Sequence, residues 1–489
     1  MSPILILVIF LIYTVMLFGV TWFTSRKADN QSFFIGNKAS PWFVVAYGMI
    51  GASLSGVTFM SLPGWVKETQ FSYLVVVMGY MFGYLVIALV LLPLYYKLKL
   101  TSIYTYLNHR FGFWTYKTGA GFFIISRTLG ASLRMFVVIN VLQIFVFDAW
   151  NIPFWVNVMV FILLIILYTM KGGIRTIIWT DTLQTTFMLL AVVLSVIYIG
   201  KSLDISLIKL GSIVKESSAS KIFVMDWQHP RFFLKQFLSG MFITITMTGL
   251  DQEMMQKNLS CKNLREAQKN MFTFSGILFF VNFLFLFLGA ILLIYVQTKG
   301  LVIGSSDDLF PTIAISHLGP VAGLVFLIGL ISAAFPSADG ALTSLTTSVS
   351  IDFLGLDKRE GISEQAKRRI RYFVHLSIAM VFFVSVLAFS ALKDKAVIDK
   401  LFTIAGYTYG PLLGLFSFGL FTTRSVNDKL TPVIAVISPV TCFLLSSYSE
   451  VLFNGYKFGF ELLLVNGLLT FAGLMIFSRK KDKPETQTV

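Results

Sequence analysis

The chain has little charge and few of the residues from which soluble enzymes and metal sites are built. Charged residues make up 13% of its 489 residues, whereas a soluble domain carries about 25%. Cys261 and Cys442 are the two cysteines, and the four histidines are dispersed without the spacing of metal ligands. We also find no Ser/His/Asp pattern and no nucleotide-binding loop of the GxxxxGK[ST] type. These absences argue against a disulfide framework, a metal cluster and an enzyme.

Long apolar runs are what the chain has in abundance. It is 56% hydrophobic with a mean hydropathy of +0.79, and each run of some 20 residues can cross a hydrocarbon core of about 30 Å. We predict an all-α membrane protein with one transmembrane domain, residues 1–489, of about 13 helices. The predicted spans are 4–24, 42–64, 73–95, 119–146, 152–170, 177–199, 233–253, 272–296, 321–349, 372–392, 399–421, 430–449 and 457–478.

The net charge of +15 would suit nucleic acid, but the distribution of the charge follows a membrane. With the N-terminus outside, the inner segments hold 25 Lys and Arg residues and the outer segments hold nine. That bias fits the positive-inside rule. We therefore predict a multi-pass protein of a plasma membrane of the bacterial inner type, with an outer N-terminus, a cytoplasmic C-terminus, and the lipid bilayer rather than nucleic acid as partner.

Two predicted spans are interrupted by glycine and hydroxyl residues. They read GMIGASLSGVTFMSLPG (48–64) and GMFITITMTGLDQE (240–253), and they lie five spans apart, so their orientations are opposite. Paired discontinuous helices in two inverted halves indicate the midplane site of a secondary transporter, although glycine and serine also serve close helix packing in lipid. The halves would be 42–199 and 233–421, preceded by an extra helix at 4–24 and followed by two helices within 430–478 and a cytoplasmic tail at 479–489.

A carboxylate stands in the middle of one span. Asp339 lies in LVFLIGLISAAFPSADGALTSLTTSVSID (324–352), among small and hydroxyl residues and three positions after Pro336. An unpaired charge there costs roughly 2.5–3.5 kcal/mol on insertion scales. A cation or a hydrogen-bonding neighbour would offset that cost, so the residue favours a cation pathway.

Four segments resemble the sodium/solute symporter family, and their order and spacing agree over roughly residues 30–425. They are SLSGVTFMSLP (53–63), GGIRTIIWTDTLQ (172–184), SAAFPSADGALTSLTTSVSIDF (332–353) and GYTYGPLLGLFSFG (406–419). Through VTFMS (57–61) and KLKLTSIYTYL (97–107) the chain resembles the sialic acid branch of that family, next to the sodium/glucose-type symporters. The resemblance implies a LeuT-type 5+5 inverted repeat with discontinuous first and sixth core helices. It also implies a monomer that couples Na⁺ to a small organic solute, such as a sugar, sialic acid or other carboxylate, by alternating access.

The resemblance places the family's common sodium site between the first and eighth core helices. Its ligands fall on Gly51, Leu54, Ala333, Pro336 and Ser337. The chain departs from the family at Pro336, which has no hydroxyl. Proline also frees the carbonyl four residues back, so the site is either rebuilt from backbone oxygen or weakened, or Pro336 is a plain kink.

A second, inner cation site is implied at Asp181 and Asp339. Asp181 matches a carboxylate that some family members use there, and Asp339 falls at one of the accompanying hydroxyl positions. Adjacent carboxylates need a cation or a shared proton to coexist. We therefore expect one or two Na⁺ ions, with H⁺ as the alternative to one of them. Asp181 as a helix cap and Asp339 as a hydrogen-bond acceptor are the structural alternatives.

The solute is expected beside the interrupted first core helix. Candidate contacts are the hydroxyls of that helix, an aromatic residue that the sialic acid branch turns toward its substrate, and two arginines one turn either side of Gly130: Ser53, Ser55, Thr58, Tyr73, Arg127 and Arg134. Arginine suits bidentate binding of a carboxylate. The alternative for either arginine is a pair with an acid such as Glu253 or a position at an interface. At the position where the family's sialic acid site has a glutamine, this chain has Val77. The resemblance therefore does not identify sialic acid as the solute.

Inner-gate or loop-ordering roles are expected for Gln252 and Glu253, and gating for the Gly-Pro-Gly signature at Gly406, Gly410 and Pro411.

Two other classes of function stay open. One is a proton-coupled or uncoupled transporter or channel, and the other is a membrane sensor with a transporter-like domain.

Overall fold

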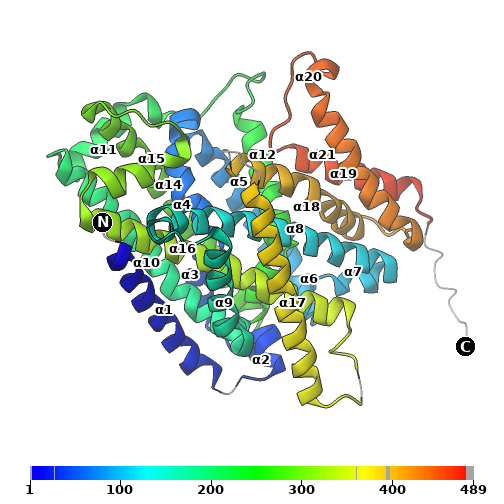
Figure 1. Ribbon diagram of the computed structural model, residues 1–489. Helices are drawn as coiled ribbons and strands as arrows, with labels where there is room; N and C mark the ends of the chain where they lie inside the picture. Colours follow the sequence, from blue (N-terminus) through cyan, green and yellow to red (C-terminus); the bar gives the residue numbers. More distant parts are fainter. Residues whose placement is uncertain (1–2, 27, 360, 392–396, 481–489) are drawn as a thin grey trace, which may run out of the picture.

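The computed structural model describes residues 3–26, 28–359, 361–391 and 397–480, and this part of the chain is almost entirely helical (Figure 1). Most of the predicted tail, 481–489, lies outside the described residues. The helices are α1 (Pro3–Ser25), α2 (Asn30–Ile35), α3 (Trp42–Ser53), α4 (Gly56–Thr69), α5 (Tyr73–Val86), α6 (Leu92–Lys97), α7 (Thr105–Arg110), α8 (Phe113–Leu142), α9 (Phe154–Gly172), α10 (Ile174–Ser202), α11 (Leu207–Glu216), α12 (Phe233–Thr244), α13 (Gln252–Leu259), α14 (Leu264–Lys299), α15 (Leu309–Thr312), α16 (Pro320–Ser348), α17 (Glu364–Ala391), α18 (Val397–Phe421), α19 (Thr431–Ser447), α20 (Ser449–Leu452) and α21 (Leu462–Ile476).

Ten helical segments among the described residues are long and apolar enough to cross a membrane, and 12- and 15-residue helices at Trp42–Ser53 and Leu462–Ile476 are apolar but shorter. The predicted number of 13 is therefore not confirmed. One segment, Gly56–Lys97, runs through parts of two predicted spans because the turn between them is itself helical. The interrupted spans are also divided into shorter helices, such as α3 and α12 of 12 residues each, which are too short to cross a membrane alone.

Both interrupted spans are broken as the sequence predicts. Helix α3 ends at Ser53, and Leu54 and Ser55 are extended (φ −94°, ψ 99° and φ −82°, ψ 174°) before α4 begins. Helix α12 passes into a π-helical turn at Ile245–Gly249, and α13 begins after Asp251, whose carboxylate accepts from the backbone N–H groups of Glu253 and Met254. The second break is therefore stabilised by a local N-cap.

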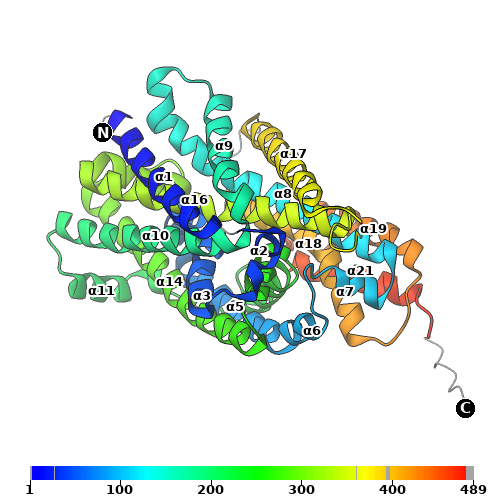
Figure 2. The same ribbon diagram turned by 90° about the horizontal axis from the view of Figure 1, so that it is seen from below.

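The broken helices meet in the centre of the molecule. Helix α3 packs on α10, α14 and α16, and α12 packs on α5. Helix α1 packs on α9, α10 and α16, whereas α19 and α21 pack beside α18 on the opposite side (Figures 1 and 2). The predicted extra N-terminal and C-terminal helices thus flank a core to which the broken helices belong.

Candidate functional site

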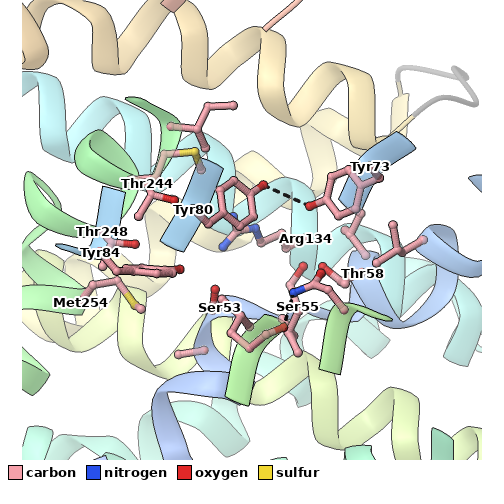
Figure 3. A pocket seen from close by; sticks show the side chains of 18 of the residues that line it. Ser53, Ser55, Thr58, Tyr73, Tyr80, Tyr84, Arg134, Thr244, Thr248 and Met254 are labelled. Carbon is pink, nitrogen blue, oxygen red and sulfur yellow. Dashed lines mark hydrogen bonds between the residues drawn. The ribbon is translucent and has the colours of Figure 1, made fainter. Parts of the chain in front are cut away.

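A cavity of about 100 Å³ lies beside the break between α3 and α4. All six predicted solute contacts line it, together with Tyr80 and Tyr84 of α5, Thr244 of α12, Thr248 of the adjoining π-turn, and Asn282 of α14. Figure 3 shows hydroxyl groups of α3, α4, α5, α12 and the π-turn arranged around this space. The wall therefore combines many hydroxyl groups with few formal charges, and the role of each group toward a solute stays a prediction.

The two arginines of α8 differ in their partners. Arg127 forms an ion pair with Glu253 and lies 3.8 Å from an Asp251 carboxylate oxygen. Arg134 has no carboxylate partner among the described residues, and its Nε has no hydrogen-bond acceptor although the side chain is only 8% exposed. Its guanidinium reaches toward Tyr80 from behind the cavity in Figure 3. A buried guanidinium without an anion is a costly arrangement that an anionic ligand would relieve.

Aromatic rings separate this cavity from a second one. Tyr73 and Tyr80 share a hydrogen bond of 3.1 Å, and the Trp65 and Tyr73 ring centroids are 5.5 Å apart. Trp65 and Tyr73 also line the second cavity, which contains Glu68 and Arg231. The two rings therefore form a partition at the end of the solute cavity.

Close helix packing brings together two residues of the predicted common sodium site, Gly51 of α3 and Pro336 of α16. A Cβ on Gly51 would lie 2.5 Å from Thr185 Oγ1 and 3.5 Å from Pro336 Cγ, so glycine is required where α3 meets α10 and α16. The Gly51 N–H donates to Thr185 Oγ1 at 3.0 Å. Because α3 ends at Ser53, the carbonyls of its last turn lose their helical donors. The missing N–H of Pro336 likewise frees the Ser332 carbonyl in α16, a helix that continues through the proline.

Hydroxyl and carbonyl oxygens are the available cation ligands here. Among the described residues, no group of three or more His, Cys, Asp and Glu side chains is arranged to hold a metal ion. Ser337 is buried, and its hydroxyl donates to the Ala334 carbonyl at 3.1 Å. Such oxygens suit a hard monovalent cation.

The two carboxylates of the predicted inner site have separate partners. Asp181 Oδ2 lies 2.7 Å from Lys257 Nζ, and Asp181 Oδ1 has no hydrogen-bond partner. Asp339 Oδ2 accepts from the Tyr168 hydroxyl at 2.8 Å, and Oδ1 accepts from the Gly340 N–H. Asp339 nevertheless interacts electrostatically with Asp181 and Lys257. The Asp181/Asp339 cation site stays a prediction, and the structure adds the ammonium group of Lys257, which pairs with Asp181.

Ion pairs continue from this point to the solute cavity. Lys257 Nζ also lies 3.6 Å from Glu253 Oε1, and Glu253 pairs with Arg127. Asp251 accepts from the Tyr409 hydroxyl of α18 at 2.6 Å. A continuous chain of charges therefore joins α10, α13, α8 and α18.

The predicted gating residues make structural contacts. Gln252 accepts from the Ile103 N–H at 2.9 Å and donates to the Thr101 carbonyl at 2.9 Å, so it fixes the segment between α6 and α7. A Cβ on Gly410 would lie 2.3 Å from Asn466 of α21. Gly406, Gly410 and Pro411 thus lie where α18 packs on α21, and their gating role stays a prediction.

Several site residues were missed by the sequence reasoning. They are Trp65, Tyr80, Tyr84, Tyr168, Thr185, Thr244, Thr248, Lys257, Asn282 and Tyr409. Their helical spacing could have signalled some of them, because Thr185 lies one turn after Asp181 on the same face of α10. Lys257 gave no such signal, since it was counted among the charges of an inner loop.

Comparisons with known proteins agree with this geometry. The model of the sodium:solute symporter family matches residues 33–429. The sodium/sialic acid symporter SiaT of Proteus mirabilis (strain HI4320) is 23% identical over 91% of this chain and 89% of its own length. The sodium/sialic acid symporter NanT of Aliivibrio fischeri (strain ATCC 700601 / ES114) is 24% identical over 87% and 84%. The human sodium/iodide cotransporter is 22% identical over 81% and 62%.

Solved structures agree on the fold. The substrate-bound outward-open state of a Na⁺-coupled sialic acid symporter superposes with a TM-score of 0.80 at 20% identity, covering 96% of this chain and 98% of the other. A nucleobase–cation symport-1 family transporter in a closed conformation gives 0.55 at 12% identity, covering 91% and 93%. The predicted all-helical inverted-repeat fold is confirmed by these similarities.

Proposed function

This chain belongs to the sodium:solute symporter family and is a Na⁺-coupled symporter of a small solute, and on that premise we propose which solute class and which ion site it uses. It is a multi-pass membrane protein. The charge distribution and the family suggest four further parts of the proposal. They are an outer N-terminus, a cytoplasmic C-terminus, a plasma membrane of the bacterial inner type and a monomeric working unit.

The proposed solute is a small hydroxylated carboxylate, a class that includes sialic acids and other sugar acids. The observation that carries the proposal is the unpaired guanidinium of Arg134 in a wall otherwise made of hydroxyl groups and aromatic rings. Arg134 would pair with the carboxylate. Ser53, Ser55, Thr58 and Tyr73 would hydrogen-bond the hydroxyl groups, whereas Arg127 is already neutralised by Glu253 and would position the wall.

The proposed coupling ion is one Na⁺ at the common site. Carbonyls of Gly51, Leu54 and Ala333 and the Ser337 hydroxyl would supply ligands, and Pro336 would contribute through the carbonyl that it frees. Thr185 Oγ1, which already faces Gly51, stands in for the hydroxyl that Pro336 lacks. Na⁺ would join the end of α3 to α16 and so favour the conformation in which the cavity accepts solute, by its differential affinity for the two states.

Uptake into proteoliposomes tests the proposal. Labelled sialic acids, sugar acids, neutral sugars and amino acids would be offered under an inward Na⁺ gradient and with K⁺ in its place. We expect Na⁺-dependent uptake of a hydroxylated carboxylate, its loss in Arg134→Gln, and no change in the matched variant Arg265→Gln, which alters an exposed arginine. Selective uptake of neutral sugars would contradict the solute assignment.

The gradients separate the alternatives. Uptake that follows a pH gradient and ignores Na⁺ would indicate proton coupling. Uptake indifferent to both gradients would indicate an uncoupled transporter or channel and would overturn the coupling mechanism. We expect no bond to be made or broken in the solute, because the cavity wall offers binding groups and no paired nucleophile and base.

A further inference from the structure

Lys257 lies where the second cation of a two-ion symporter would be expected. It is 1% exposed and extends from α13 to Asp181 of α10, with Nζ 2.7 Å from Oδ2. The same Nζ is 3.6 Å from Glu253 Oε1. One ammonium group therefore pairs with two carboxylates in the interior of the helix bundle, and the buried carboxylate of Asp339 belongs to the predicted inner site.

We propose that Lys257 is a tethered cation that takes the place of a second Na⁺, so that this symporter binds a single Na⁺. The inference rests on the proposed coupling by one Na⁺ at the common site. An ammonium ion and a Na⁺ both carry one positive charge, and close approach of both to one buried carboxylate is opposed by their mutual repulsion. The lysine is covalently attached, so it neutralises Asp181 without being transported.

Polar atoms without partners on α10, at Asp181 and one turn after it, support a site that could otherwise hold an ion. Asp181 Oδ1 has no partner, and neither amide atom of Gln184, one turn further along α10, has one, although both side chains are fully buried. Native interiors rarely leave such atoms without a partner. A simple ion pair between Lys257 and Asp181 does not require the oxygens Asp181 Oδ1 and Gln184 Oε1, whereas a cation site requires several oxygen ligands.

The ammonium group also links the two proposed sites mechanically. Lys257 and Glu253 belong to α13, Glu253 pairs with Arg127, and Arg127 lines the solute cavity. Asp181 belongs to the same face of α10 as Thr185, which contacts Gly51 at the common sodium site. Lys257 therefore holds α13 against α10 without drawing on the ion gradient.

Equilibrium binding of ²²Na⁺ to the purified full-length protein tests the inference without any solute. We expect one Na⁺ per wild-type protein and a Hill slope of one. Lys257→Met should bind two Na⁺, because it leaves Asp181, Glu253 and Asp339 with one fewer cation. Lys257→Arg, which keeps the charge, and Lys262→Met, which removes an exposed lysine five residues on, should each still bind one.

The outcomes separate this inference from the proposed coupling. No Na⁺ binding by the wild-type protein would overturn the coupling itself. Two Na⁺ ions per wild-type protein, or one in a correctly folded Lys257→Met variant, would overturn the tethered cation while leaving symport intact. If Lys257→Met elutes as an aggregate, Asp181→Asn decides the question. It should leave one Na⁺ bound if Lys257 occupies the site, and a lower count would overturn the inference.

Discussion

Arg127 and Arg134 lie seven residues apart on α8, yet the structure assigns them opposite effects on stability and binding. Arg127 neutralises Glu253 and lies 3.8 Å from Asp251, and all three side chains are buried. Removing one partner of a buried ion pair costs about 3–5 kcal/mol, because a carboxylate is left buried without compensation. Arg127→Leu should therefore be destabilised, with an apparent melting temperature lower by about 3–5 °C for a chain of this length.

Arg134→Leu should behave in the opposite way. Arg134 forms no ion pair among the described residues, so its replacement by leucine breaks none, removes a buried charge and should leave the melting temperature unchanged or higher. Loss of a buried partner to a carboxylate solute costs about 2–5 kcal/mol, and every 1.4 kcal/mol is a factor of about ten in affinity. The apparent affinity for the solute should then fall roughly 30-fold or more.

A thiol-reactive dye provides the stability measurement, because Cys261 and Cys442 are buried free thiols that unfolding would expose. Solute affinity comes from competition with labelled solute in the same preparations. The reasoning is refuted if Arg134→Leu loses as much thermal stability as Arg127→Leu. It is also refuted if a stable Arg127→Leu protein loses solute binding while Arg134→Leu keeps it, since the two roles would then be exchanged.

Three other substitutions test the proposed sodium site and the packing of α21 on α18. Thr185→Val should lower Na⁺ affinity about tenfold, since one oxygen ligand is worth about 1–2 kcal/mol, whereas Thr186→Val on the exposed face of α10 should leave it unchanged in ²²Na⁺ binding. Pro336→Ser restores the hydroxyl found in the family and should raise Na⁺ affinity, and an unchanged or lower affinity would show that the proline does not limit the site. Asn466→Leu removes both donors to the carbonyls of Gly406 and Tyr407 and should cost about 1–3 kcal/mol. An unaltered melting temperature would contradict this last expectation.

The sequence was sufficient for features that local composition determines. Glycine and hydroxyl residues cluster at 48–58 and 240–249, and both clusters weaken a helix wherever they occur, so the two breaks could be predicted without knowledge of the fold. The six candidate solute contacts came from the hydroxyls near the first break and from the family resemblance; they line one cavity, and their role toward a solute stays a prediction. Helix number was less predictable, since a helical turn at Gln70–Ser72 joins α4 to α5 and hides a boundary.

Partnerships between distant residues could not be predicted. Lys257 stands in a polar stretch that reads as an inner loop, and its partner Asp181 lies 76 residues earlier. Only the folded chain shows that α13 turns inward after the Asp251 cap and buries the whole of Gln252–Leu259. For the same reason, the sequence could not tell which arginine of α8 was already neutralised.

The prolines of α16 and α18 show why equal motifs need not have equal roles. Each lacks an N–H and so frees the carbonyl four residues back, which is Ser332 for Pro336 and Tyr407 for Pro411. The Asn466 side chain donates to the Tyr407 carbonyl at 2.9 Å, so the packing of α18 on α21 already satisfies it. Among the described residues no side chain donates to the Ser332 carbonyl, which lies in a helix that packs against the broken end of α3. A freed carbonyl with a resident donor stabilises a helix contact, whereas one without a donor has a lone pair available for an ion. We therefore predict that the cation binds beside Pro336, and that the carbonyl freed by Pro411 serves helix packing.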